Sequence, residues 1–405
     1  MKFNNNILQQ NNHKENLIEF LDSLSNEFDY AILHHAHRIF SGRDDIDLIV
    51  NCSKIEIQNY IKKFVQDKGY LLGSYYTIDK SIYRFDIFYY FNNKLFKIEL
   101  DCACKGNKSD LLGINTTKLL KNKVIINVDG YDCFKVNNQS EIEYYIKKKA
   151  FKKNEIKPHV HYLKSLDPEL TEDGIIDRYN VWQNYFSSFL FKLKFVKNKI
   201  SLLTHRINEK PSVTICFLGP DGSGKSTIIN KLQKEKLFIN NYYFHLKPLI
   251  VDNANTKNVV ANPHDKPVYS GFKSYLKLLY FIFEYNLGWI KNIWPLKIKS
   301  SLIIFDRYYD DIFVDYKRYR FGGKVVFAKL VKKIIPKPDI YFILTADAQV
   351  IYNRKKEVTF DELERQISGY NELSDQKKYY RIDVDKTPNE ITKEIILILM
   401  SKLNE

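Results

Sequence analysis

Residues 219–227 form a glycine-rich segment with the spacing of a phosphate-binding loop. The segment reads Gly-Pro-Asp-Gly-Ser-Gly-Lys-Ser-Thr, which fits the pattern G-x-x-x-x-G-K-[ST], and it directly follows the apolar run 213–218. Glycines let the backbone curl so that successive N–H groups point at phosphate oxygens, and a helix beginning near Lys225 presents its positive end to the same anion. The chemistry that this segment predicts is the binding of ATP with Mg²⁺.

The polar positions of the loop have separate roles. Lys225 brings a positive charge to the β- and γ-phosphates, and the Ser226 hydroxyl is placed to ligate Mg²⁺. The candidate nucleotide-binding residues are Gly219, Asp221, Gly222, Ser223, Gly224, Lys225, Ser226 and Thr227. A plain glycine-rich turn is the alternative, but a strand before the loop and a helix after it are the context that the motif requires.

A second chemical element follows the apolar run 301–305. Asp306 comes directly after that run, at the place where the carboxyl end of a parallel strand meets bound ligands. Asp306 is therefore the second candidate for holding Mg²⁺. The next residue, Arg307, is a candidate for stabilising the transferring phosphoryl group, with a surface salt bridge as the alternative.

Strands and helices must alternate to position these residues. After the glycine loop, strand-like runs recur at 302–305 and 340–344, with helical segments between them. This alternation predicts an α/β fold with a parallel sheet.

The loop and the run Asp306-Arg307-Tyr308 together resemble the thymidylate kinase family, over about residues 211–405. The resemblance implies a P-loop kinase with a five-stranded parallel sheet, a lid that carries an arginine, and common formation of homodimers. It also implies that Asp221 and Arg307 face the phosphate acceptor and that Arg354 is the lid arginine. A solvated helix of alternating charge is the other interpretation of the segment around Arg354.

The chain departs from that family at the acceptor side. Leu218 stands where the family has an acidic residue, and His245-Leu-Lys247-Pro248 stands where it has Arg-Glu-Pro. We therefore expect an acceptor other than dTMP. The catalytic base stays unassigned, with Asp221 and Asp310 as the nearest candidates.

The first 150 residues carry a different pattern. Helices are expected at 15–27 and 53–68, strands at 30–33 and 45–50, and a hairpin of 83–91 with 94–102 that turns at Asn92-Asn93. This pattern predicts a small α+β domain, which resembles nucleotidyltransferases. Asp45 and Asp47 alternate on one strand and Asp101 follows on a later one, so the three carboxylates are candidate ligands of a divalent metal.

Two other features of this domain bear on its activity. His34-His35 replaces the Gly-Ser that nucleotidyltransferases use to cradle a triphosphate. A polar, exposed strand face would also explain the alternating aspartates. We expect a substrate-recognising or inactive domain more than an active enzyme.

Residues 151–210 are expected to form a basic helical connector. Its stretch 185–206 sets apolar residues on one side with lysines interspersed, which is typical of a helix that lies on an anionic membrane. A connector packed on a domain with its lysines in water is the alternative.

Bulk composition narrows the function classes. The chain of 405 residues has room for two domains, its apolar fraction of 44% is that of a globular protein, and its five cysteines form no C-x-x-C pair. The net charge of +15 is spread along the chain and predicts no specific nucleic acid partner. The polar N-terminal segment lacks a signal-peptide core, so a cytoplasmic location, with contact at the inner membrane face, is expected.

The combined architecture resembles proteins associated with bacterial surface-polysaccharide synthesis. That resemblance implies a kinase for a sugar, a sugar phosphate or a lipid-linked glycan. A nucleoside monophosphate kinase and an ATP-binding scaffold without turnover are the alternatives.

Overall fold

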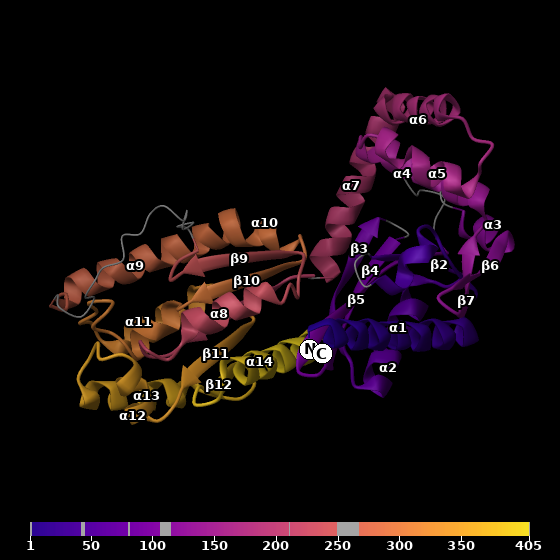
Figure 1. The fold of residues 1–405 in the computed structure, drawn as a ribbon. Coiled ribbons are helices and arrows are strands. Elements are labelled where there is room, and N and C mark those ends of the chain that lie inside the picture. Colours follow the sequence, from indigo (N-terminus) through magenta and orange to yellow (C-terminus); the bar gives the residue numbers. More distant parts are fainter. Residues whose placement is uncertain are drawn as a thin grey trace. The chain divides into compact units, whose positions relative to one another are not determined.

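The computed structural model describes residues 2–41, 45–79, 82–105, 115–209, 211–248 and 267–404. The chain forms two compact units, Met1–Glu209 and Lys210–Glu405, which are described separately (Figure 1). The segment 151–210, expected as a connector, lies in unit 1 except for its last residue.

Unit 1 contains a mixed sheet of seven strands in the order β3-β4-β5-β2-β1-β7-β6. The strands are β1 (Tyr30–Ile32), β2 (Ile46–Val50), β3 (Leu71–Asp79), β4 (Ile82–Phe91), β5 (Lys94–Cys104), β6 (Lys123–Val128) and β7 (Tyr131–Val136). The helices are α1 (Lys2–Glu27), α2 (Lys54–Lys68), α3 (Thr116–Lys121), α4 (Asn138–Lys152), α5 (Val160–Leu166), α6 (Glu172–Ser187) and α7 (Phe189–Glu209).

The predicted hairpin of unit 1 is confirmed. β4 and β5 pair antiparallel up to Phe91 and Lys94, and the two turn residues Asn92 and Asn93 have φ angles of 48° and 59°. Asparagine tolerates this left-handed conformation, which a tight two-residue hairpin turn requires at both positions. The hairpin carries β5 back beside β2, where the two strands run parallel with Asp47 opposite Asp101.

Unit 2 has the predicted five-stranded, all-parallel sheet, in the order β12-β11-β8-β10-β9. Its strands are β8 (Val213–Leu218), β9 (Asn240–His245), β10 (Ser301–Asp306), β11 (Ile340–Thr345) and β12 (Tyr379–Asp383). Every residue of β8, β10 and β11 is buried, which is typical of parallel strands covered by helices on both faces. β8 lies in the centre, so the glycine loop that follows it opens at the middle of the carboxyl edge.

The helices of unit 2 complete the α/β layers. They are α8 (Lys225–Lys234), α9 (Gly271–Gly288), α10 (Trp294–Lys297), α11 (Val325–Ile334), α12 (Ala348–Arg354), α13 (Phe360–Leu373) and α14 (Pro388–Asn404). The apolar stretch 275–294 comprises most of α9 and the helical turn after it, and it buries only part of its surface: Phe281 is 2% exposed but Phe283 is 66% exposed. Among the helices of the described residues, none has the length and apolar character to cross a membrane.

A buried ion pair ties β7 of unit 1 to α4. Lys135 Nζ lies 2.8 Å from Glu141 Oε2, and both side chains are at least nine-tenths buried. The other carboxylate oxygen of Glu141 accepts from the His35 backbone N–H (2.9 Å) and from the Tyr162 hydroxyl. Glu141 therefore joins the carboxyl end of β1 to α4 and α5.

Replacing Lys135 by Met should destabilise unit 1 by about 3–5 kcal/mol, because Glu141 would keep a buried charge without its counter-ion. Lys147→Met is the matched control, since Lys147 pairs with a Glu143 carboxylate that is 60% exposed, and its loss should cost less than about 1 kcal/mol. Hydrogen exchange of peptides from β1, β2 and β7 reports on unit 1 alone. Equal protection in the two variants would contradict this role of the pair.

Candidate functional site

The glycine loop joins β8 to α8 in a conformation that only glycine accepts at its first position. Gly219 has a φ of +142°, and a Cβ atom there would lie 2.3 Å from the carbonyl oxygen of Leu344 on β11. At the other end, Gly224 has a φ of +83° and is the N-cap residue of α8. The loop therefore passes close to the neighbouring strand β11 and leads directly into the N-terminus of α8.

Lys225 lies over the loop with its amino group turned inward. Its Nζ donates to the carbonyl oxygens of Gly219 (2.9 Å) and Pro220 (2.8 Å). Burial, together with the charge of Arg307, lowers the pKa of Lys225 to about 8. The phosphates of a nucleotide would offer this ammonium a stronger, charged partner than the two carbonyls do.

Asp306 and Ser226 fit a role in binding Mg²⁺. Asp306 ends β10, which runs parallel beside β8, and its Oδ2 accepts from the Tyr243 hydroxyl (3.2 Å). Its other oxygen, Oδ1, is buried without a hydrogen-bond partner. Ser226 and Thr227 are exposed in the first turn of α8. An orphaned carboxylate oxygen and an open hydroxyl are the oxygen ligands that Mg²⁺ prefers, directly or through its waters.

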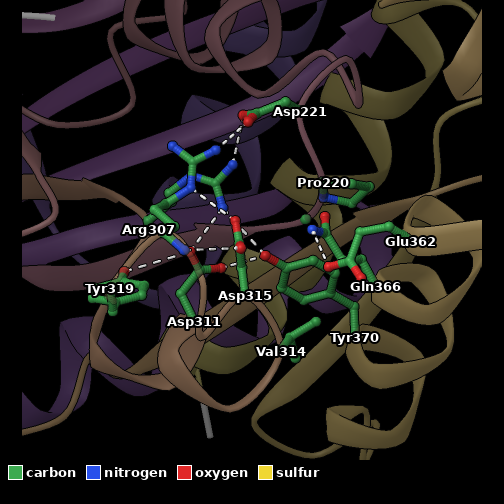
Figure 2. Close-up of polar contacts among 12 residues, drawn as sticks. Pro220, Asp221, Arg307, Asp311, Val314, Asp315, Tyr319, Glu362, Gln366 and Tyr370 are labelled. Carbon is green, nitrogen blue, oxygen red and sulfur yellow. Dashed lines mark hydrogen bonds and ion pairs between the residues drawn. The ribbon is translucent and has the colours of Figure 1, made fainter. Parts of the chain in front are cut away.

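Arg307 is the most fully enclosed cation of the site. Its side chain is 2% exposed, its backbone has a φ of +70°, and its N–H donates to Phe217 O on β8. Nη1 lies 2.8 Å from Asp311 Oδ2 and 3.2 Å from the Tyr370 hydroxyl, and Nη2 lies 2.6 Å from Asp221 Oδ1. Figure 2 shows this network between the glycine loop and the residues that follow β10.

Asp221 is shared by two arginines. Its Oδ1 accepts from Arg307 and its Oδ2 accepts from Arg318, whose own Nε lies 2.8 Å from Asp315 Oδ2. Burial of Asp221 would raise its pKa, but the charges of Arg307, Lys225 and Arg318 outweigh it and hold the pKa well below its usual range. Asp221 is therefore a carboxylate that binds both guanidinium groups beside the glycine loop.

The two consecutive aspartates after β10, Asp310 and Asp311, have different partners. Asp311 is fully buried and contacts Arg307, Tyr370 and, at 3.4 Å, the Tyr319 hydroxyl. Asp310, named above as a candidate base, instead pairs with Lys332 (2.5 Å) and accepts from the Tyr379 hydroxyl (2.9 Å). Asp310 therefore joins α11 to β12, while Asp311 supports the site.

The predicted lid arginine has a backbone partner. Arg354, at the end of α12, donates from Nη2 to the carbonyl oxygen of Val384 (3.0 Å) and is exposed. The residues after it approach the glycine loop instead: a Cβ on Gly222 would lie 3.0 Å from the Cβ of Lys355, and hydrogen bonding to Asp221 raises the pKa of Glu357. A direct role of Arg354 in phosphoryl transfer stays a prediction.

A further group of cations lies beyond the end of β9. Lys247 Nζ is 3.3 Å from Glu284 Oε2, a carboxylate that is 1% exposed. Lys277 donates to the carbonyl oxygen of Tyr319. Burial lowers the pKa of Lys277 to about 8, and the neighbouring charges of Lys247 and Arg320 act in the same direction. Lys247 thus pairs with a buried carboxylate, and Lys277, which is close to Lys247 and Arg320, contacts the tyrosine whose hydroxyl lies 3.4 Å from Asp311.

The candidate metal ligands of unit 1 lie near basic side chains, and one of these, Arg84, is close to both Asp45 and, at 3.7 Å, Asp101. Asp47 is buried, with its Oδ2 2.6 Å from His34 Nε2 and 3.2 Å from Lys148 Nζ. Asp45 is exposed and lies 4.0 Å from the Arg84 guanidinium.

Asp101, the third candidate, is the neighbour of Asp47 across β2 and β5. Burial, and then the charge of Asp47, raise its pKa to about 7. Within the described ranges, no three His, Cys, Asp or Glu side chains are grouped so that they could hold a metal ion. Of the histidine pair that replaces Gly-Ser, His34 contacts Asp47, while burial lowers the pKa of His35 to about 4. Metal binding by the three carboxylates stays a prediction.

Sequence reasoning did not assign Arg318, Asp311, Asp315 or Tyr370 to the site. Asp315 and Arg318 are three residues apart and form an ion pair, so their spacing carried a local signal. Tyr370 reaches Asp311 from α13, and nothing in the local sequence marks that contact.

Comparisons with known proteins point to one kinase family. No protein-family model matches the chain. A curated protein from Methanosarcina barkeri, described as a probable thymidylate kinase, is 23% identical over 209 residues, which is 47% of this chain and 97% of that protein. This chain is thymidylate kinase-like over about half its length. Such homologues are ATP-dependent kinases, which agrees with the kinase prediction.

Two solved structures are similar to this thymidylate kinase-like chain. The thymidylate kinase of Ehrlichia chaffeensis matches 46% of this chain and 98% of its own, with 22% identity and a TM-score of 0.34. The thymidylate kinase of Candida albicans matches 48% of this chain and 94% of its own, with 19% identity and a TM-score of 0.37.

Replacing Lys225 by Ala should weaken ATP binding by about 10- to 100-fold, because a charge-assisted hydrogen bond to phosphate contributes about 1.5–3 kcal/mol. Isothermal titration with ATP and Mg²⁺ measures the affinity. Lys234→Ala is the matched control, since Lys234 is exposed in the last turn of the same helix. Unchanged affinity in Lys225→Ala, with the control also unchanged, would remove the loop from nucleotide binding.

Proposed function

We propose that unit 2 transfers the γ-phosphoryl group of ATP to an acceptor that is itself a phosphomonoester. Homology to thymidylate kinases supports a nucleotide-kinase type of phosphotransferase. We choose this class of acceptor because Asp221 binds Arg307 and Arg318 at the same time.

The proposed roles follow from the geometry of the loop. Lys225 and the loop amides hold the phosphates of ATP, and Ser226 with Asp306 organises Mg²⁺, which neutralises charge on the transferring group. Arg307 lies between the loop and the acceptor side, where its guanidinium can stabilise the same charge. The bond from the γ-phosphorus to the bridging oxygen breaks, and a new bond forms to an oxygen of the acceptor.

The pairing of Asp221, Asp310 and Asp311 with cations favours a phosphate oxygen as the nucleophile. A sugar hydroxyl attacks well only if a base removes its proton, whereas a phosphomonoester is already an anion at neutral pH. Asp221 is a poor base because two guanidiniums hold its pKa low. Asp310 pairs with Lys332, and Asp311 pairs with Arg307. These aspartates are therefore suited to positioning cations rather than to accepting a proton.

The cations beyond β9 agree with an anionic acceptor. The charges of Lys247 and Arg320 lower the pKa of Lys277, so the three cations repel one another, and Lys277 contacts the tyrosine that adjoins Asp311. A phosphate or a second anionic group of the acceptor would relieve the mutual repulsion of these cations.

Within this class, two kinds of acceptor remain as proposals. Nucleoside monophosphates are supported by the homology to thymidylate kinases. Sugar phosphates and phosphate-bearing lipid-linked glycans are supported by the resemblance of the whole architecture to proteins of surface-polysaccharide synthesis, and by Lys247-Pro248 in place of Arg-Glu-Pro.

ADP release by the purified chain should rise with phosphomonoesters and stay at the basal level with unphosphorylated sugars. The panel contains dTMP, other nucleoside monophosphates, sugar phosphates, the matching free sugars and a lipid extract. Lys225→Ala should lower any stimulated rate by about 10²- to 10³-fold, since it removes one charged donor from the transition state. Stimulation by free sugars alone would contradict the proposed acceptor class, and ATP binding without turnover on any acceptor would make the chain an ATP-binding scaffold.

A further inference from the structure

The last helix of unit 1, α7, is fixed by one face and by its C-terminal end. On the inner face, the centre of the Phe191 ring lies 4.8 Å from that of Phe186 of α6 and 6.1 Å from that of Phe151 of α4. At the end of the helix, Arg206 Nε donates to the carbonyl oxygen of Thr77 on β3, and Glu209 accepts from the Thr77 N–H (2.9 Å). These contacts hold α7 in place without its outer face.

That outer face is an exposed apolar stripe along the whole helix. Its members recur at alternating intervals of four and three residues, which places them on one line of the helix surface. They and their exposed fractions are Phe189 (73%), Leu193 (54%), Val196 (54%), Ile200 (61%), Leu203 (43%) and Ile207 (54%). An exposed apolar line of this length usually marks an interaction surface.

Exposed lysines border the stripe on both sides. By heptad position, Lys192 and Lys199 flank one side and Lys197 flanks the other, and all three are exposed. The single carboxylate of α7 is Glu209, which is already engaged by Thr77 and Lys54. The surface beside the N-terminal half of the stripe is therefore cationic.

These charges argue against a second α7 as the partner. In a parallel helix pair the two flanking positions face each other, and in an antiparallel pair each flanking position faces its own kind. Lysine meets lysine in either arrangement, because Lys192 and Lys199 lie on one flank and Lys197 lies on the other. A partner with an apolar layer for the stripe and negative charges for the lysines on either side of it would complement this surface.

We propose that α7 binds the protein to an anionic lipid bilayer, lying in the plane of the interface. At 1.5 Å per residue its 21 residues span about 30 Å. The stripe would enter the boundary between headgroups and acyl chains, while the lysine stems extend along it and place their ammonium groups among the anionic headgroups. The inference is independent of the acceptor proposed for unit 2.

The test is flotation of the full chain with vesicles of pure phosphatidylcholine and with vesicles that contain about 30% phosphatidylglycerol. Binding should require the anionic lipid. It should also weaken as salt rises from about 0.1 M to about 1 M, because the Debye length falls from about 10 Å to about 3 Å.

Two variants separate the apolar and the ionic contributions. Leu193→Ser with Ile200→Ser should reduce vesicle binding at least about tenfold, and so should Lys192→Glu with Lys199→Glu. The controls make the same changes at exposed positions outside α7: Ile55→Ser, where Ile55 is 68% exposed, and Lys63→Glu with Lys234→Glu. Both controls should bind vesicles as the unmodified chain does.

Three results would overturn the proposal. Equal binding to neutral and anionic vesicles would remove the charge argument. Unchanged binding by both α7 variants would move the lipid contact to another surface, such as the apolar side of α9. No vesicle binding, with a dimer that the Leu193→Ser, Ile200→Ser variant dissociates in light scattering, would make the stripe a contact between copies of the chain.

Discussion

Asp221 joins two parts of the site that are distant in the sequence, since it lies 86 residues before Arg307 and 97 before Arg318. It belongs to the loop that binds phosphate, yet both of its oxygens bind arginines from the segment after β10. Within that segment, Asp311 binds Arg307 and Asp315 binds Arg318. Tyr370 of α13 donates a hydrogen bond to Asp311. A substitution of Asp221 in the phosphate loop would therefore also affect the acceptor side. It would remove the carboxylate that balances the charges of Arg307 and Arg318 there.

Much of unit 2 could be predicted because parallel strands are buried on both faces. The runs at 213–218, 302–305 and 340–344 are nearly continuous apolar sequences, and the structure confirms each as a strand. The glycine pattern defined the loop, and the position of Asp306 after a buried strand located it at the correct edge of the sheet. In unit 1, the Asn-Asn turn defined the hairpin in the same local way.

The rest depended on contacts between distant residues. Arg318 and Tyr370 reach the site from other elements, and the periodicity of their own segments says nothing of that. Alternating Asp45 and Asp47 predicted a shared metal, but two of the side chains that lie against them, Lys148 and Arg84, come from a later helix and strand. From Phe189 on, the apolar side predicted for 185–206 is the exposed face of α7, but the periodicity did not show that Phe191 packs inward or that the helix is interrupted at Ser188.

The central claim is that the acceptor oxygen belongs to a phosphate, because the aspartates near the loop are committed to cations. Phosphorus NMR of the reaction products tests this claim most directly, since a phosphoanhydride product gives two coupled phosphorus resonances and a phosphate ester gives a single one. We predict coupled resonances from the product formed with the best acceptor of the panel. A single uncoupled resonance, from phosphate placed on a hydroxyl, would contradict the account.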